Sequence, residues 1–430
     1  MTDKILTVRM DAHPSDSHTL SRYLDTGGYE ALTKALNDMS KEDIIEEVKA
    51  SNLRGRGGAG FPMGVKWGFL APAEPRYLVV NCDESEPGTF NDRQLTERDP
   101  HQLLEGIIIS SYALGVSHAF VYIRGEYPKS ARRLQRAVEE AYDAGYLGQD
   151  IRGTEFSLDV TLHLGGGAYI CGEETALLNS LEGRRGEPRL KPPFPAVEGL
   201  YAKPTIVNNV ESISNVPWIM TNGGTAYAAI GPERSAGTKM LSISGHIARP
   251  GNHEIVMGMT WRELIFDIGG GIPDGKALKA WIPGGASAPW FVPDEHLDTI
   301  VSIDDVAANG SMIGAGAVVV MDETTNVVAA AHRIVRFFAH ESCGQCTPCR
   351  EGTSWLEAVL KRILDGNGRP EDIDLMLDIS DNISPGLKWP PAMTTICPLG
   401  PSTVSPITSI TRWFRPELEA MIAGSEGPVG

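Results

Sequence analysis

Short apolar runs alternate with helical periods between residues 77 and 181, and this alternation constrains the fold more than any other feature of the chain. Strands that alternate with helices form parallel sheets, whose two faces the helices then cover. We therefore expect an α/β fold in the first half of the chain, preceded by a helical stretch in residues 1–50. The expected strands are 77–80, which is an apolar run suited to a buried strand, 119–123 and 158–163, and the expected helices are 102–114, 130–142 and 173–181.

The pattern changes twice after this region. Residues 221–238 are small and polar, which predicts a linker, and four strands around one short helix follow, as in an α+β unit of the β-grasp kind. From residue 324 the apolar period becomes helical, which favours a small helical bundle. We expect a multidomain chain, α/β and α+β, with domains 1–237, 238–323 and 324–430. The expected strands are 239–244, 254–259, 278–282 and 317–321, the short helix is 261–268, and the bundle-core stripes are Val327, Ala331, Ile334, Val335, Phe338 and Trp355, Leu356, Val359, Leu360, Ile363.

Composition excludes several classes of protein. The net charge of −17 argues against a general nucleic-acid binder, which needs a basic face. No apolar run approaches the ~18 residues of a membrane span. The first twenty residues have neither a basic region nor an apolar one, so we expect no secretory signal and a cytosolic chain that meets a membrane only through partners.

The strongest local signal is a cysteine cluster near the C-terminal end. Cys343, Cys346 and Cys349 follow one another at three-residue steps, and the bacterial ferredoxin run would place a fourth cysteine at position 353, which is threonine. Cys397 is the only downstream candidate for a fourth ligand. A structural zinc site remains the alternative, but it usually arranges its cysteines as two separated pairs. Three clustered thiolates and a remote one favour a [4Fe–4S] cluster, and hence redox transfer.

A glycine-rich segment at residues 55–60 satisfies the pattern GxGxxG. The dinucleotide fingerprint should follow a strand, whereas a predicted helix precedes this segment, so a flexible connector is the alternative. Its flanks support ligand binding, because cations beside exposed backbone N–H groups suit a phosphate and flat aromatic faces suit a heterocycle. The cations are Arg54, Arg56 and Lys66, and the aromatic residues are Phe61, Trp67 and Phe69.

Two further segments lie where ligands bind in α/β proteins. The glycines of 165–172 follow a predicted strand and precede a helix, so a ligand could reach the helix N-terminus there. Glu173 and Glu174 open that helix, which acidic residues favour in any case. The polar residues 81–89 follow the first strand, at the carboxyl end where parallel sheets bind ligands, and a solvated acidic turn is the alternative.

Five segments together resemble the NADH-binding flavoprotein subunit of respiratory complex I. They are LRGRGGAGFPMGVKW, NCDESEPGTFNDR, GAYICGEETALLNSLEGRRGEPRLKPPFPA, KPTIVNNVES and ESCGQCTPCREG, in the family's order, and the resemblance covers about residues 20–420. It implies a Rossmann-like FMN- and NADH-binding domain, a ubiquitin-like β-grasp domain and a C-terminal bundle that carries [4Fe–4S]. Similar motifs mark the diaphorase subunits of NAD-linked hydrogenases and formate dehydrogenases.

The resemblance also implies the roles of individual residues. The glycine loop, including Gly60, would bind FMN together with NADH, and Phe61 and Phe69 would stack the NADH adenine. Lys191 and Phe194 would complete the nicotinamide-nucleotide pocket with Glu86, the catalytic-site residue, which would shape the pocket and help discharge NAD⁺ by charge and hydrogen bonding. The cluster ligands would be Cys343, Cys346, Cys349 and Cys397. The flavin-lining residues would be Gly55, Gly57, Gly58, Lys66, Asn81, Asp83, Tyr169, Gly172, Glu173, Glu174, Asn208 and Asn209.

Two positions depart from the family pattern. Cys82 stands where a small residue is expected, and we expect it to be a buried thiol rather than a ligand. The 47 residues between Cys349 and Cys397 exceed the usual spacing, and 384–391, rich in proline, is the expected surface insertion.

The resemblance implies the activity of an NADH:quinone oxidoreductase subunit. Hydride would pass from NADH to FMN, and single electrons would pass to the cluster and on to partner clusters and quinone, with the cofactors supplying the chemistry. The implied partners are a thioredoxin-like [2Fe–2S] subunit and a large multi-cluster subunit, and the implied location is the cytoplasmic side of the cell membrane. Two alternatives are a diaphorase subunit, whose chains often carry extra N-terminal domains, and a scaffold, which would show broken flavin motifs.

Overall fold

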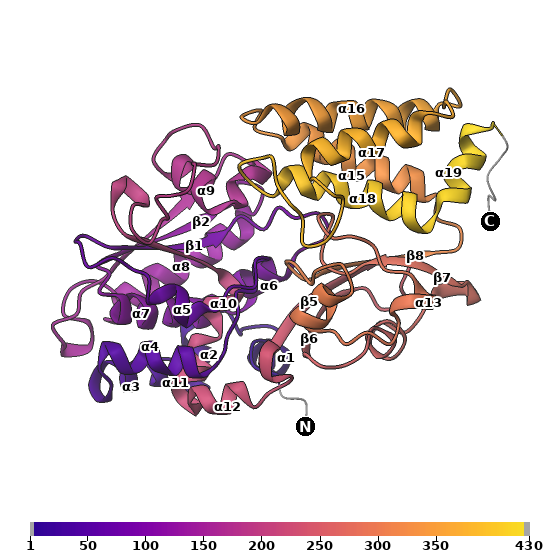
Figure 1. Ribbon diagram of the computed structural model, residues 1–430. Coiled ribbons are helices and arrows are strands. Elements are labelled where there is room, and N and C mark those ends of the chain that lie inside the picture. Colours follow the sequence, from indigo (N-terminus) through magenta and orange to yellow (C-terminus); the bar gives the residue numbers. More distant parts are fainter. Residues whose placement is uncertain (1–3, 425–430) are drawn as a thin grey trace. The chain divides into compact units, whose positions relative to one another are not determined.

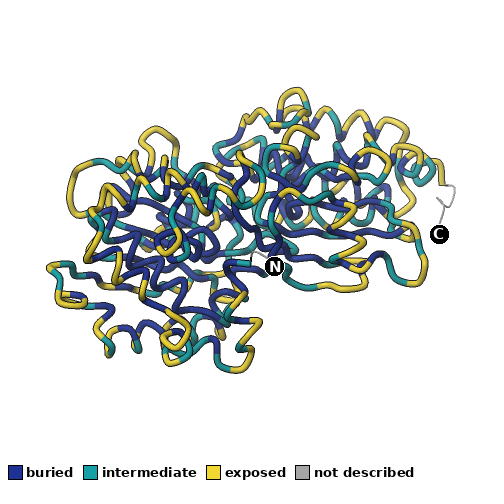
Figure 2. Tube along the Cα trace, turned by 90° about the horizontal axis from the view of Figure 1, so that it is seen from below, coloured by how far each residue is buried: buried dark blue, intermediate teal, exposed yellow. Residues whose placement is uncertain are grey.

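The computed structural model describes residues 4–424 of the chain (Figure 1). Contacts divide the chain into two compact units. The first unit consists of Met1–Ser85, Phe90–Leu241 and Asn252–Gly258, and the second of Glu86–Thr89, Ser242–Gly251 and Met259–Gly430. Each unit has its own cluster of buried apolar residues, drawn dark blue in Figure 2.

The first unit contains a sheet of four parallel strands. In chain order the strands are β1 (Tyr77–Cys82), β2 (His118–Ile123), β3 (Asp159–Leu164) and β4 (Thr205–Asn209). Their spatial order is β3-β2-β1-β4. The chain therefore builds outward on one side of β1 and then returns to the other side, so the strand order reverses between β1 and β4. The parallel α/β fold is confirmed, whereas β4 was not expected.

Helices pack around this sheet, and their burial follows from the sequence. α7 (Pro100–Leu114) is buried along almost its whole length and ends at Gly115, whose φ of 68° suits glycine. α8 (Pro128–Asp143) buries Leu134, Val138 and Ala141 on one face. The other helices of this unit are α1 (Val8–Ala12), α2 (Leu20–Asp25), α3 (Glu30–Asp38), α4 (Lys41–Ala50), α5 (Met63–Trp67), α6 (Asn91–Arg98), α9 (Glu174–Leu181), α10 (Val210–Ser214), α11 (Val216–Asn222) and α12 (Gly224–Ala228).

Residues 221–238 are not a linker, so that expectation is wrong. The segment contains α12, which packs against α4. Tyr227 is fully buried, and its hydroxyl accepts a hydrogen bond from Arg56 at 3.2 Å and donates one to Asn215 at 3.1 Å. One aromatic anchor thus fixes a segment whose small, polar composition resembles that of a flexible connection.

A buried carboxylate fixes the N-terminal segment of the first unit. Glu254, in β6 (Gly251–Val256), accepts hydrogen bonds from the backbone N–H groups of Ile5, Leu6 and Thr7 at 2.8, 2.9 and 2.8 Å. The hydroxyl of Thr238 donates to the same carboxylate at 2.7 Å. Successive backbone N–H groups form an anion-binding concavity, so Glu254 holds this segment through main-chain atoms.

The second sheet is mixed. Its strands are β5 (Thr238–Gly245), β6, β7 (Leu278–Ile282) and β8 (Ala317–Asp322), in the order β6-β5-β8-β7. β5 and β8 are parallel, and β7 and β8 are antiparallel. A π-helical turn, Glu263–Ile268, lies in the expected short helix. Two short helices, α13 (Pro293–His296) and α14 (Ile303–Ala308), precede β8.

The second sheet is followed in the chain by the helices α15 (Val327–Glu341), α16 (Thr347–Leu364), α17 (Asp372–Ile383), α18 (Leu399–Trp413) and α19 (Arg415–Ile422) (Figure 1). α15 packs against α16 and α18, and α17 packs against the same two helices. Of the expected first stripe, Ile334 is only partly buried. No helix among residues 4–424 is long and apolar enough to cross a membrane.

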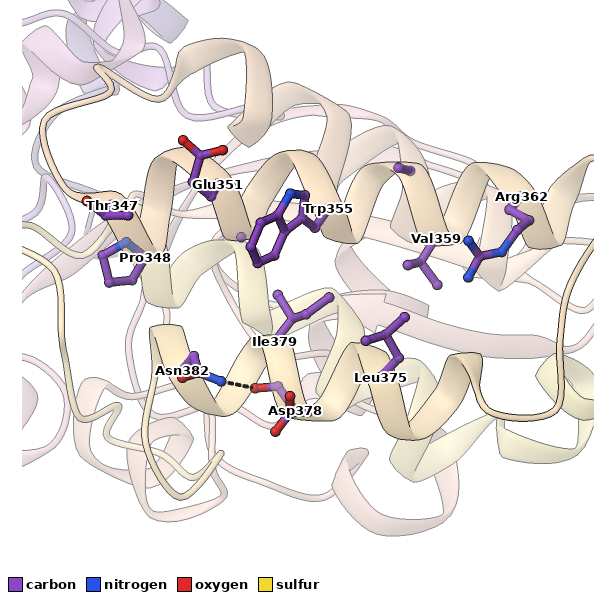
Figure 3. A pocket seen from close by; sticks show the side chains of 12 residues that line it. Thr347, Pro348, Glu351, Trp355, Val359, Arg362, Leu375, Asp378, Ile379 and Asn382 are labelled. Carbon is purple, nitrogen blue, oxygen red and sulfur yellow. Dashed lines mark hydrogen bonds between the residues drawn. The ribbon is translucent and has the colours of Figure 1, made fainter.

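Trp355 does not belong to the core of these helices, which corrects the second stripe. Its side chain is 56% exposed and lines a groove of about 610 Å³ between α16 and α17 (Figure 3). Leu356 and Leu360 are fully buried. Neighbouring residues on a helix point about 100° apart, so Trp355 lies beside the apolar stripe rather than within it.

Candidate functional site

The point where the strand order reverses brings two expected site residues together. Asn81 lies near the carboxyl edge of β1, opposite Asn209, the last residue of β4. Ligands of open α/β sheets bind in the crevice at such a switch point. The Asn81 side chain donates to the carbonyl oxygen of Gly172 at 2.9 Å and accepts from the backbone N–H of Asp83 at 3.0 Å. This edge is therefore the candidate site.

The second glycine segment borders the same edge. Its 3-10 turn, Tyr169–Gly172, lies beside Asp83, because a Cβ atom on Gly172 would be 3.2 Å from a carboxylate oxygen of Asp83. The Ser85 hydroxyl bridges the two segments by bonding to Asp83 and to the carbonyl oxygen of Tyr169. Gly166 has no atom within 4 Å of its Cβ position, so the segment faces open space there.

The first glycine loop lies against the end of β4. A Cβ atom on Gly57 would be only 2.8 Å from Cβ of Asn209, so the close approach requires glycine. The loop is closed by a hydrogen bond from the Gly55 N–H to the Phe61 carbonyl at 2.8 Å. Gly58, with a φ of 134°, has open space where a side chain would be, and Gly60, with a φ of 62°, completes the turn. The open space beside Gly58 leaves room for a phosphate-bearing cofactor next to the loop backbone.

Two lysines and two glutamates form an ionic group at this edge. Lys66 donates to Glu174 at 3.1 Å, and Lys191 donates to Glu173 at 3.0 Å and to Glu174 at 2.9 Å. Burial works to raise the pKa of Glu174, but the Lys66 and Lys191 ammonium groups outweigh it and hold that pKa below its ordinary value. For Lys191, burial works to lower the pKa, but the two carboxylates outweigh it and the pKa is raised.

Glu173 also caps α9, since one of its oxygens accepts from the backbone N–H groups of Thr175 and Ala176 at 2.8 and 2.9 Å. The interpretation of this residue as a helix opener is confirmed. Its other oxygen binds Lys191, so the same carboxylate also belongs to the ionic group.

Three exposed phenylalanines are available for stacking. The rings of Phe61 and Phe69 lie 6.1 Å apart, centre to centre, and their side chains are 46% and 59% exposed. Phe194 is 58% exposed. Apolar rings left this open are suited to an aromatic ligand.

Two expected ligand contacts are wrong. Arg56 is buried, and its guanidinium donates to the carbonyl oxygen of Ala236 at 2.6 Å, so it cannot serve as a surface cation for phosphate. Trp67 is 2% exposed, and its indole N–H donates to Asn208 at 3.0 Å, so it offers no stacking face. Asn208 is itself buried, and its side-chain oxygen is engaged by this bond. Arg56 and Trp67 thus hold the loop in place rather than touch a ligand through their side chains.

Glu86, unlike the residues named so far, belongs to the second compact unit. Its carboxylate accepts hydrogen bonds from the backbone N–H and the hydroxyl of Ser287, at 2.7 and 2.9 Å. Cys82 is fully buried at the end of β1, and burial raises its pKa well above the ordinary value, which agrees with an inert thiol.

The cysteine region places sulfur atoms, which are soft metal ligands, next to the N-terminus of helix α16. Cys346 precedes α16, and its sulfur accepts the backbone N–H of Ile396 at 3.2 Å, which places the segment of Cys397 beside it. Burial raises the pKa of Cys349, the Ser342 hydroxyl lowers it, and the nearby sulfurs of Cys346 and Cys343 raise it. None of the six cysteines forms a disulfide. Within residues 4–424 no three His, Cys, Asp or Glu side chains are gathered closely enough to hold one metal ion.

Sequence reasoning missed a group of buried charges behind the glycine loop. Asp92 is 4% exposed and accepts a hydrogen bond from the Asn209 side chain at 2.5 Å. Lys239 and Glu211 are fully buried as an ion pair. Charged residues are almost never fully buried without partners. A single sequence does not reveal which charges are buried. The only signal for Asp92 was its place in Asn-Asp-Arg, the last three residues of the second motif.

Comparison with known families identifies the class of this protein. Residues 48–218 match the model of the Nuo51 FMN-binding domain, and residues 329–421 match that of the NADH-ubiquinone oxidoreductase-F iron-sulfur binding region. The protein is thus an oxidoreductase subunit with FMN, a [4Fe–4S] region and NADH as substrate. It is 52% identical over 415 residues to the F subunit of NADH-quinone oxidoreductase from Streptomyces coelicolor, in an alignment that covers 96% of this chain and 90% of that protein. The chain belongs to this family of NADH-quinone oxidoreductase subunits.

Other relatives agree. The corresponding NADH-quinone oxidoreductase subunit of Mycobacterium tuberculosis is 51% identical over 95% of this chain and 91% of its own length, and that of Rhizobium meliloti is 49% identical over 95% of each. Among solved structures, an NAD⁺-reducing [NiFe]-hydrogenase in the H₂-reduced state superposes with a TM-score of 0.83 at 33% identity, over 94% of this chain. The chain spans 66% of that hydrogenase chain.

Proposed function

We propose that this chain is the NADH-oxidising subunit of an NADH:quinone oxidoreductase, respiratory complex I, and that the edge between β1 and β4 holds its FMN. The observation that supports this most directly is the open glycine loop, where Gly57 touches Asn209 and Gly58 faces empty space. Bound FMN supplies the chemistry that links a two-electron hydride donor to one-electron carriers. The backbone N–H groups of the loop and the Lys66 ammonium would hold the phosphate.

The remaining residues would orient the two nucleotides. Asn81, Asp83, Gly172 and Asn209 would line the flavin, joined by the others named from the resemblance, and Phe61 and Phe69 would stack the adenine. Lys191 and Phe194 would border the nicotinamide, and Glu86 would shape that pocket by charge and hydrogen bonding. Cys343, Cys346, Cys349 and Cys397 would hold the cluster, for which thiolates are the usual ligands.

We further propose three domains: a Rossmann-like domain in 1–237, a ubiquitin-like β-grasp domain in 238–323 and a cluster-bearing helical bundle in 324–430. The mixed sheet with parallel β5 and β8 supports the second. The packing of α15–α18 supports the third.

The proposed partners are a thioredoxin-like [2Fe–2S] subunit and a large multi-cluster iron–sulfur subunit, on the cytoplasmic side of the cell membrane. A diaphorase subunit of a hydrogenase is the second candidate, favoured by the hydrogenase similarity. The 52% identity with a quinone-linked relative over nearly the whole chain favours the first candidate.

A cluster-free variant tests the proposed function. Cys343→Ala with Cys346→Ala should bind FMN, lose its flavin absorbance when NADH is added, and still reduce ferricyanide. In the assembled complex it should no longer reduce quinone. Circular dichroism checks the helices first, because cluster binding can contribute to folding. A folded, flavin-loaded variant that NADH cannot bleach, or that still reduces quinone, would refute the scheme.

A further inference from the structure

A buried carboxylate lies directly behind the glycine loop. One oxygen of Asp92 accepts the amide of Asn209 at 2.5 Å, and the other accepts the backbone N–H of Glu211 at 3.1 Å. Asn209 in turn caps α10 by accepting the backbone N–H of Ser212 at 3.2 Å. Since Gly57 packs on Cβ of Asn209, the position of the loop depends on Asn209, and the orientation of Asn209 depends on Asp92.

A second carboxylate lies beside Asp92. Glu84 accepts the backbone N–H groups of Asp92 and Arg93 at 2.5 and 2.8 Å, at the first turn of α6, and the Tyr127 hydroxyl at 3.0 Å. A carboxylate at a helix N-terminus is stabilised by the helix dipole. The two acids are therefore neighbours, although they are held by different donors.

Of the buried carboxylates in this region, Glu211 is neutralised by a cation, whereas Glu84 and Asp92 are hydrogen-bonded to uncharged donors. Glu211 pairs with Lys239, whose ammonium also donates to the carbonyl of Met240 at 3.0 Å, so these two charges cancel. The hydrogen bonds to Glu84 and Asp92 come from backbone, amide and hydroxyl donors rather than from an ammonium group. The titratable and charged groups that face the pair are Cys82 and Asp83 from β1 and the turn after it, Arg93 from α6, Arg124 and Tyr127 from the turn after β2, Glu211 from α10 and Lys239 from β5.

Burial shifts both acids in the same direction. It raises the pKa of Glu84 to about 7, against the hydrogen bonds from Arg93, Asp92 and Tyr127. Burial, followed by the charges of Glu84 and Glu211, raises the pKa of Asp92 well above its ordinary value. Two neighbouring buried carboxyls titrate as a pair, so the first proton is lost far more easily than the second.

We propose that Asp92 is a positioning residue for the cofactor loop, acting through Asn209. The inference rests on the proposed function, because it assumes that the loop beside Asn209 holds an anionic cofactor. Asp92 supplies the acceptor that keeps the Asn209 amide in its orientation behind the loop.

The acid beside Asp92 gives FMN binding a pH dependence with a definite sign. Below about pH 7 the Glu84 carboxyl holds its proton, because burial raises its pKa to about 7. Above that pH Glu84 ionises, a negative charge appears behind the loop, and an anionic cofactor binds more weakly.

The test is FMN affinity of the deflavinated protein, measured by flavin fluorescence between about pH 6 and pH 8.5. The wild type should lose affinity as the pH rises, by roughly tenfold, the order expected for one added unit charge at a partly buried site. Glu84→Gln should flatten that profile. Asp92→Ala should weaken binding at pH 6 at least tenfold, whereas Asp92→Asn, which keeps an acceptor for Asn209, should stay within threefold of the wild type.

Asp99→Asn is the matched control. Asp99 is a buried acid that pairs with Arg9 rather than with a residue of the loop, so this variant should keep the wild-type profile. An unchanged slope in Glu84→Gln would overturn the assignment of the pH dependence to Glu84, and full affinity of Asp92→Ala at pH 6 would overturn the positioning role. If Asp92→Ala does not fold, Asn209→Ala replaces it and should show the same tenfold loss. A wild type that binds no FMN at any pH would instead refute the proposed function.

Discussion

Lys239 and Glu211 form a deeply buried ion pair of the first unit, with side-chain exposures of 2% and 0%. Removing one partner of such a pair leaves a charge without compensation, which typically costs about 3–5 kcal/mol. Lys239→Met should therefore lower the free energy of unfolding by that amount, as measured by urea denaturation.

Lys129→Met is the control for this variant, because the Lys129 side chain is 59% exposed and pairs with Glu97 at the surface. Exposed pairs contribute about 0–1 kcal/mol. Equal losses in the two variants would show that the burial of Lys239 carries no special cost.

Phe69 offers a ring that the fold itself does not use for its core. If it stacks the adenine, Phe69→Ala should weaken NADH binding by about 0.5–1.5 kcal/mol, or roughly two- to twelve-fold, and leave the FMN content unchanged. Isothermal titration with NADH measures the loss, and Phe266→Ala, another exposed phenylalanine, is the control. Loss of flavin with unchanged NADH affinity would contradict the assigned role.

At the scale of elements, the segment between α17 and α18 carries the remote cysteine. The N–H of Ile396 already bonds to the Cys346 sulfur, so the segment is held close to the clustered thiols. Cys397→Ser should lower the bound iron and remove or alter the electron paramagnetic resonance signal of the reduced cluster. Cys82→Ser, at a thiol buried in β1, should leave both unchanged. Full iron content in Cys397→Ser would place the fourth ligand elsewhere.

Much of the first sheet could be predicted, because β1 and β2 contain the continuous apolar run that a buried parallel strand needs, and in β3 Val160 and Leu162 alternate with polar residues. β4 was missed because its last two residues, Asn208 and Asn209, are polar and belong to the candidate site. Trp355 was misplaced because the helical period of an apolar stripe does not show which residue at its border faces solvent.

The candidate site could be predicted only in part. The motifs indicated Asn81, Gly172 and Lys66 as members of one site, and each of them lies at or beside the carboxyl edge of the first sheet. The inward direction of Arg56, in contrast, depends on Tyr227 and Ala236, which lie 171 and 180 residues further along the chain. No local pattern around Arg56 contains those partners, so its burial could not be predicted from the motif.

At the scale of the whole molecule, buried acids contribute to the way stability depends on pH. Burial raises the pKa of Glu84 to about 7 and, against the attraction of Arg9, that of Asp99 to about 6. In the unfolded chain these acids ionise near pH 4, so between about pH 4 and pH 7 they bind more protons in the folded protein than in the unfolded one. Their contribution to stability therefore falls as the pH rises through this window, whereas histidines such as His101, whose pKa burial lowers, act in the opposite direction.

The thermal unfolding midpoint, followed by circular dichroism from about pH 5.5 to pH 8, isolates the contribution of Glu84 when a variant is compared with the wild type. Glu84→Gln cannot ionise, so its midpoint relative to the wild type should rise across this range, whereas that of Glu139→Gln, at an exposed position on α8, should stay constant. A relative midpoint of Glu84→Gln that falls over this range would contradict the raised pKa of Glu84.

Glu254 holds the N-terminal segment through main-chain atoms, so this contact depends on the side chain at position 254 and not on the side chains at positions 5–7. The carboxylate recognises three main-chain N–H groups, which any residue except proline provides. This contact therefore does not restrict which amino acids other than proline occupy positions 5–7. Position 254 has no such freedom, because aspartate is one methylene shorter and glutamine offers one acceptor oxygen instead of two. Selection for the attachment thus acts on a residue 249 positions away from the first one it holds.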